Sequence, residues 1–260
     1  MLTRIISGAI GIILFIAVIA APPAVLEIAL ILLSSIGIYE TYKAFSISKY
    51  IPLLILSMAL PLMFSGYLIT WLPLYAFILI IAAVATMLKC HESFSSEKLA
   101  ASVFYPLLIS AAFSLIGVLR ESSDNGIWKM CLPFAMAWST DTFAYFTGRF
   151  FGKHKLCEKL SPKKTVEGAV GGVIGAIIVV IIYTYFCPSK VNYLIAVLFA
   201  IAVSIVSQMG DIFFSCIKRE NGIKDFGNLM PGHGGVMDRF DSVMLTAPLT
   251  YLFITLTNFI

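Results

Sequence analysis

Charged side chains are concentrated in one stretch of this chain, residues 207–242, whose flanks are almost continuously apolar. Ten of the chain's Asp, Glu, Lys, Arg and His residues fall there: Asp211, Lys218, Arg219, Glu220, Lys224, Asp225, His233, Asp238, Arg239 and Asp241. Charge is costly beside hydrocarbon, so such a cluster indicates a functional site. Carboxylates suit hard cations such as Mg²⁺, and basic side chains suit phosphates. A solvated loop with ordinary salt bridges is the alternative interpretation.

The spacing of these residues favours the functional interpretation. If the helix that precedes them continues through Cys216, then Asp211, Ser215, Lys218 and Arg219 share one helical stripe. The run Pro231–Gly235 cannot be helical and exposes backbone N–H groups. Asp238 and Asp241 follow at i, i+3, where we expect the first turn of the last apolar segment, and a helix N-terminus favours carboxylates.

A second charged block begins at Asp141 and continues through residues 149–167. Its composition also fits a basic loop that contacts anionic lipid headgroups. Lys163, Lys164 and Thr165 lie where we expect the next apolar segment to begin, and helix N-termini commonly bind phosphates. We therefore expect these three residues to bind substrate and Asp141 to support a metal or a lysine.

The glycines that follow this block, Gly168, Gly171, Gly172 and Gly175, have the small-residue spacing typical of closely packed membrane helices. We interpret them as structural. The five cysteines contain no CxxC pair, which argues against a disulfide framework or a zinc site.

The composition indicates a polytopic membrane protein, because 60% of the residues are hydrophobic, 12% are charged and the mean hydropathy is +0.96. We predict an all-α fold with about nine transmembrane helices of roughly 20 residues each. Residues 1–126 would supply about five spans, and residues 127–260 about four spans with catalytic loops at 149–167 and 208–242. We expect polar loops at 40–50 and 89–98, spans near 51–67 and 75–88, and Pro52, Pro61 and Pro73 at span ends or at a kink. The first apolar run also resembles a signal sequence.

The distribution of basic residues predicts the orientation. With nine spans and a cytoplasmic N-terminus, 15 of the 18 Lys and Arg residues fall in cytoplasmic segments. Both charged blocks would then face the cytoplasm, at the inner membrane of the cell.

The string SCIKRENGIKDFGNLMPGHGGVMDRFD, from Ser215 to Asp241, resembles the signature of the phosphatidate cytidylyltransferase (CDP-diglyceride synthase) family. The string DTFAYFTGRFFGKHKLCEKLSPKKTVEG, from Asp141 to Gly168, is similar to a region upstream in the same family. The two matches cover roughly the C-terminal half of the chain.

The resemblance implies transfer of a cytidylyl group from CTP to phosphatidic acid, giving CDP-diacylglycerol and pyrophosphate with Mg²⁺ and possible use of a second cation. It implies metal ligation by Asp211, Asp238 and Asp241, with Lys218 also catalytic. Substrate binding would fall to Lys163, Lys164, Thr165, Arg219, Lys224, Asp225, His233 and Arg239, with support from Asp141 and Ser215. Expected partners are membrane lipids and the two substrates, not nucleic acid; a homodimer is left open.

Two other functions use similar features. A secondary transporter also carries intramembrane Asp residues, but it predicts inverted repeats and charges at the bilayer midplane. A related lipid enzyme, acting on a prenol or an ether lipid, would keep the nucleotide features and change the acceptor. The two motifs favour the cytidylyltransferase.

Overall fold

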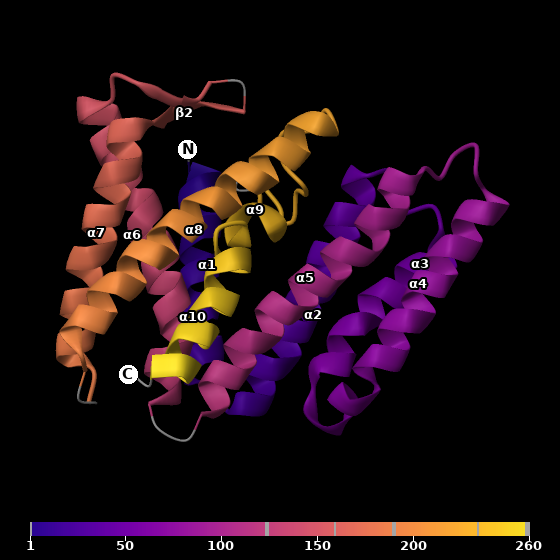
Figure 1. The fold of residues 1–260 in the computed structure, drawn as a ribbon, viewed down its shortest axis with the longest axis horizontal. Helices are drawn as coiled ribbons and strands as arrows, with labels where there is room; N and C mark the ends of the chain where they lie inside the picture. The colour runs from indigo at the N-terminus through magenta and orange to yellow at the C-terminus, as the bar shows by residue number, and fades with distance from the viewer. Residues whose placement is uncertain (1, 123–124, 159, 189–190, 233, 258–260) are drawn as a thin grey trace. The chain divides into compact units, whose positions relative to one another are not determined.

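The computed structural model describes residues 2–122, 125–158, 160–188, 191–232 and 234–257, with only the backbone for residues 2–6. It is mostly helical, and it divides into two compact units. The first unit comprises Met1–Gly117 and Asn221–Phe240, and the second comprises Val118–Glu220 and Asp241–Ile260. Figure 1 shows the elements of both units as ribbons.

The first unit contains eight elements within the described residues: α1 (Leu2–Ala20), α2 (Pro23–Ala44), α3 (Ile51–Ala59), η1 (Leu60–Phe64), η2 (Gly66–Trp71), α4 (Leu72–Lys89), α5 (Ser96–Glu121, up to Gly117) and α9 (Met237–Phe240). The prolines explain several boundaries. Pro52, Pro61 and Pro73 each lie in the first turn of an element, where the missing N–H costs no hydrogen bond. Their prediction as end markers is confirmed.

The core of the first unit joins α2, α3 and α5. Ile38, Leu53 and Phe113 are buried in it. The buried Tyr42 hydroxyl donates a hydrogen bond to the Ser102 carbonyl oxygen at 3.0 Å and also contacts the Ser57 hydroxyl. A buried polar group needs such partners, so Tyr42 fixes how these three helices meet.

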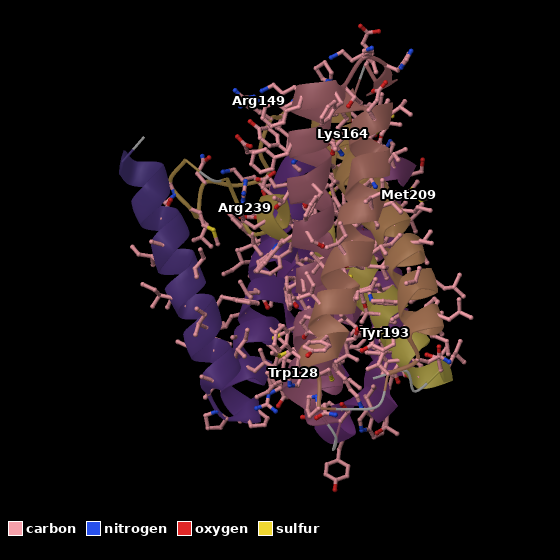
Figure 2. All side chains as sticks on the ribbon, turned by 90° about the vertical axis from the view of Figure 1, so that its left-hand side faces the viewer. Trp128, Arg149, Lys164, Tyr193, Met209 and Arg239 are labelled. Carbon is pink, nitrogen blue, oxygen red and sulfur yellow. The ribbon has the colours of Figure 1, made fainter. Side chains whose placement is uncertain are left out.

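The second unit contains the end of α5 and six further elements: α6 (Gly126–Phe151), β1 (Lys155–Cys157), β2 (Ser161–Thr165), α7 (Val166–Phe186), α8 (Tyr193–Glu220) and α10 (Val243–Thr257). The strands pair antiparallel, with Lys155 opposite Thr165 and Cys157 opposite Ser161. This hairpin lies beyond the adjoining ends of α6 and α7 (Figure 1). Figure 2 shows Arg149 and Lys164 at that end, and Trp128 and Tyr193 at the opposite end of the unit.

The glycines of α7 allow close packing against α6, which confirms their structural interpretation. All four are buried. A Cβ on Gly171 would collide with Thr147, one on Gly175 would collide with Phe143, and one on Gly168 would lie 2.8 Å from the Ala144 carbonyl oxygen. Only a glycine face lets the two backbones approach this closely.

Near Pro61, α3 gives way to the 3-10 segments η1 and η2, as expected for a proline that ends or kinks a span. The structure corrects three predictions. The fold is not all-α, because two strands form within the charged block, where the backbone pairs with itself in a hairpin. The segment 40–50 is not entirely loop, since α2 continues to Ala44. Asp238 and Asp241 do not open the last long helix: Asp238 lies in α9, and Asp241 lies before α10.

Five helical segments among the described residues are long and apolar enough to cross a membrane: Pro23–Ala44, Gly66–Lys89, Ser96–Glu121, Val166–Phe186 and Tyr193–Glu220. Shorter apolar helices add to them at Ser7–Ala20, Ile51–Phe64 and Val243–Thr257. The chain therefore has the character of an integral membrane protein.

Candidate active site

A cavity of about 520 Å³ lies in the second unit, among α6, the hairpin, α7 and α8. Its charged lining residues are Asp141, Arg149, Lys155, Lys163, Lys164 and Asp211. Four cations and two carboxylates in one concave site can bind a polyanion together with a cation. The sequence strings that contain these residues lie far apart, and the fold brings them together.

An ion pair joins the two charged blocks inside this cavity. The Lys164 ammonium on β2 lies 2.7 Å from Asp211 Oδ2 on α8, and the side chains are 24% and 30% exposed. Ser215, one turn further along α8, lies 3.4 Å from the other Asp211 oxygen and donates its hydroxyl to it. The predicted helical stripe therefore exists, and its first two members interact.

Two more carboxylates, those of Asp141 and Asp241, interact electrostatically with Asp211. The Ser242 hydroxyl donates to Asp141 Oδ2 at 3.1 Å, and the Ser242 backbone N–H donates to Asp241 Oδ1 at 2.8 Å. Burial raises the pKa of Asp241 to about 7, and repulsion from Asp211 and Asp141 adds to this, while Lys218 and the Ser242 N–H oppose it. Three carboxylates that destabilise one another's charge form a site that a cation would stabilise.

The donor chemistry of Asp141, Asp211 and Asp241 fits Mg²⁺, which prefers carboxylate oxygens. Within the part of the chain that the structure describes, no three His, Cys, Asp or Glu side chains already form a closed ligand set. Magnesium usually keeps several waters and shares its coordination with substrate phosphates, so two carboxylates are enough to hold it. The ligand atoms that these residues offer therefore fit Mg²⁺.

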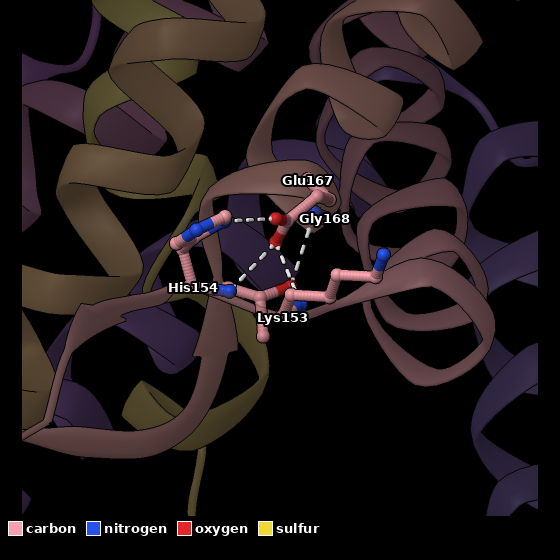
Figure 3. A network of polar contacts seen from close by, with 5 residues as sticks. Lys153, His154, Glu167 and Gly168 are labelled. Carbon is pink, nitrogen blue, oxygen red and sulfur yellow. Dashed lines mark hydrogen bonds and ion pairs between the residues drawn. The ribbon is translucent and has the colours of Figure 1, made fainter.

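The hairpin is fastened to α7 by Glu167, as Figure 3 shows. The Glu167 carboxylate accepts the backbone N–H groups of Lys153 at 3.0 Å and His154 at 3.2 Å, and it pairs with His154 Nδ1 at 2.6 Å. Thr165 caps α7, since its hydroxyl accepts the Gly168 N–H at 3.1 Å. These contacts fix the position of Lys163 and Lys164 relative to the helix.

A set of buried and part-buried polar groups links α6, α7 and α8 near the cavity. The Thr140 hydroxyl donates to Ser204 Oγ at 3.1 Å, and Gln208 donates to the Ala169 carbonyl oxygen at 3.2 Å. Gln208 also lines the cavity. The sequence analysis missed Gln208, although a Gln three residues before an intramembrane Asp was an available signal.

In the first unit, Asp238 organises the loop that carries the glycine-rich run. Its Oδ2 atom accepts the N–H of Phe226 at 2.8 Å and the N–H of Gly235 at 3.0 Å, and the residue is 9% exposed. Gly232 and Gly234 have φ of 78° and 87°, a conformation that favours glycine. The prediction of a non-helical run is therefore confirmed for its described residues.

Glu40, on α2, is the second carboxylate that binds this loop, and the sequence analysis missed it. Its Oε1 accepts the Val236 N–H at 3.0 Å, and its Oε2 accepts the Met237 N–H at 2.9 Å. The polar loop predicted at 40–50 includes Glu40, whereas this residue is buried in the last turns of α2. An acidic residue at the end of an apolar helix was the available signal.

The predicted site residues are therefore distributed as follows. Asp141, Lys163, Lys164, Thr165 and Asp211 line one cavity, and Asp241 and Lys218 interact electrostatically within the same unit. Lys218 is buried, whereas Arg219 is exposed at the end of α8. Lys224, Asp225 and Arg239 are exposed in the first unit, and His233 lies outside the described residues.

The model of the cytidylyltransferase family matches residues 2–257. The chain belongs to this family. The resemblance indicated by the two motifs is thereby confirmed, and the match extends it to the N-terminal half.

Named relatives of this chain agree with that assignment. It is 29% identical over 262 residues to the phosphatidate cytidylyltransferase of Bacillus subtilis (strain 168), with 97% of each chain covered. It is 39% identical over 144 residues to that of Staphylococcus haemolyticus (strain JCSC1435), and 38% identical over 144 residues to that of Staphylococcus aureus (strain COL). The chain spans about half the length of these staphylococcal relatives, with 55% of each covered.

Proposed function

We propose that this protein transfers a cytidylyl group from CTP to phosphatidic acid, and so forms CDP-diacylglycerol and pyrophosphate for phospholipid synthesis. The observation that carries the proposal is the Lys164–Asp211 pair in a cavity lined by three further cations. A triphosphate needs several cations around it, and Asp211 keeps one of them in place until an anion arrives. Membership of the cytidylyltransferase family supplies the reaction class.

In the proposed reaction, a phosphate oxygen of phosphatidic acid attacks the α-phosphorus of CTP. The bond between the α-phosphorus and the bridging oxygen to the β-phosphorus breaks, and pyrophosphate leaves with that oxygen. The attacking oxygen is already anionic, so no strong general base is needed. Repulsion between two anions is the main obstacle, and Lys163, Lys164, Arg149 and Lys155 would reduce it.

We expect Asp141, Asp211 and Asp241 of the second unit to hold Mg²⁺. The ion would neutralise phosphate charge in the complex. Asp238 stays a predicted ligand, with Lys224, Asp225, His233, Arg219 and Arg239 as predicted nucleotide contacts and Lys218 beside Asp241. A second, monovalent cation and a homodimer are further proposals.

We also propose nine membrane spans with a cytoplasmic N-terminus and the reaction on the cytoplasmic side. The asymmetry of the basic residues supports this orientation. It would expose the hairpin lysines to soluble CTP and leave phosphatidic acid in the adjoining leaflet.

The test is an assay of detergent-purified protein with labelled CTP, phosphatidic acid and Mg²⁺. We expect label in the lipid phase, equimolar pyrophosphate and no product without Mg²⁺. Polyprenol and ether-lipid acceptors are run in parallel. Transfer only to one of those acceptors would change the substrate, and no transfer to any lipid by a folded preparation would refute the proposal.

A further inference from the structure

Glu40 is a buried carboxylate that the proposed reaction does not use. It lies near the C-terminal end of α2, is 4% exposed, and is 196 residues away in sequence from its first partner. Both of its oxygens accept backbone N–H groups, from Val236 and from Met237. Carboxylate oxygens accept hydrogen bonds, and burying a carboxylate is costly unless its oxygens have such partners.

Glu40 and Asp238 act on the same loop. Asp238 accepts the N–H groups of Phe226 and Gly235, and Glu40 accepts those of the next two residues along the chain, Val236 and Met237. Three consecutive backbone N–H groups therefore point at two carboxylates. This arrangement determines the path of the chain that leaves the glycine-rich run and enters α9.

The Glu40 side chain lies close to two glycines of the signature, Gly227 and Gly235. A Cβ added to Gly227 would lie 2.7 Å from Glu40 Cδ, and one added to Gly235 would lie 2.5 Å from it. In both cases the three nearest atoms all belong to Glu40. Neither glycine has a positive φ. Close approach to the Glu40 carboxylate, rather than backbone conformation, is therefore what requires glycine at these two positions.

We infer that Glu40 is a positioning residue of the enzyme: it holds the signature loop 226–238 in its working conformation through the Val236 and Met237 amides. This inference rests on the proposed function, because the loop carries residues that we expect to take part in the reaction. Glu40 acts through these backbone amides.

The test compares Glu40→Gln with Glu27→Gln, the same substitution on the same helix away from the loop. The amide of Glu40→Gln has nearly the same shape but presents a donor to a backbone N–H, so one hydrogen bond is lost. Hydrogen exchange is measured on peptides that cover residues 224–240, together with the thermal midpoint, kcat, and KM for CTP and phosphatidic acid.

We expect faster exchange in residues 224–240 of Glu40→Gln only, with exchange elsewhere unchanged. We expect kcat to fall about 10- to 100-fold, since small displacements of reacting groups are costly. KM for phosphatidic acid should stay within about twofold, a split that general destabilisation would not produce. Unchanged exchange over the loop, or faster exchange with normal kcat, would overturn the inference.

A double-mutant cycle guards against simple misfolding. Gly235→Ala should impair activity in the wild-type background and have little further effect beside Glu40→Ala, because the collision partner is then absent. Additive losses would refute the inference. If the wild-type enzyme makes no CDP-lipid at all, the proposed function fails, while the exchange data still decide whether Glu40 holds the loop.

Discussion

Asp211 and Asp238 are both carboxylates of the charged stretch 207–242 with partners inside the protein, yet they belong to different units and have different kinds of partner. Asp211, in the second unit, pairs with the Lys164 ammonium and lines a cavity. Asp238, in the first unit, accepts two backbone N–H groups and lines no described part of that cavity. The contrast shows that acidic residues of one charged stretch can have either a side-chain cation or backbone N–H groups as partners.

The same contrast extends to neighbouring residues. In the second unit, cations and carboxylates line one cavity. In the first unit, Glu40 and Asp238 satisfy backbone amides, which have no alternative partner once they are buried. Substitutions in the two regions should therefore produce different combinations of lost activity and lost order.

The largest expected effect is that of Asp211→Asn. Loss of the charge leaves Lys164 without its ion-pair partner and removes a proposed Mg²⁺ ligand. CDP-lipid formation should therefore fall about 100- to 1000-fold. Hydrogen exchange over residues 224–240 should stay at the wild-type rate. Glu220→Gln, which removes an exposed acid from the end of the same helix, is the control. Turnover within threefold of wild type would remove Asp211 from the site.

Asp238→Asn should give a smaller loss of turnover, about 10- to 100-fold, joined to disorder of the loop. The remaining carbonyl oxygen still accepts an N–H, but the charge that attracted both amides is gone. Exchange at Phe226 and Gly235 should therefore accelerate, which Asp211→Asn should not cause. A matched titration with Mg²⁺ separates the two roles: rescue of turnover by excess Mg²⁺ with the loop still ordered would favour metal ligation over loop holding.

The smallest effect is expected for Glu167→Gln. Glu167 also accepts backbone N–H groups, but it does so in an exposed setting where water competes. Its loss should loosen the hairpin and raise KM for CTP about two- to fivefold, with kcat little changed. Lys153→Met keeps the same backbone hydrogen bond and serves as the control. A fall in kcat as large as that of Asp238→Asn would show that exposure does not separate the two kinds of carboxylate.

Local sequence patterns predicted much of the structure. The helical stripe of Asp211 and Ser215, the glycine packing of α7 and the proline boundaries all depend on residues within one or two turns. The sequence also predicts part of the site in the second unit, because its two charged blocks contain four residues that line the cavity: Asp141, Lys163, Lys164 and Asp211. The hairpin was missed, since its second strand, four polar residues and a proline, carries no alternating apolar pattern.

The sequence alone determined that the chain is an apolar, mostly helical membrane protein and which family it belongs to, because hydropathy and motif spacing are properties of short segments. Only the tertiary structure decided which partner each carboxylate has. Lys164 meets Asp211 across 47 positions of sequence, and Glu40 meets Val236 and Met237 across nearly 200. Tertiary packing determines such pairs, because it brings a charged group next to the partner that can bond to it. Local sequence patterns do not contain that information.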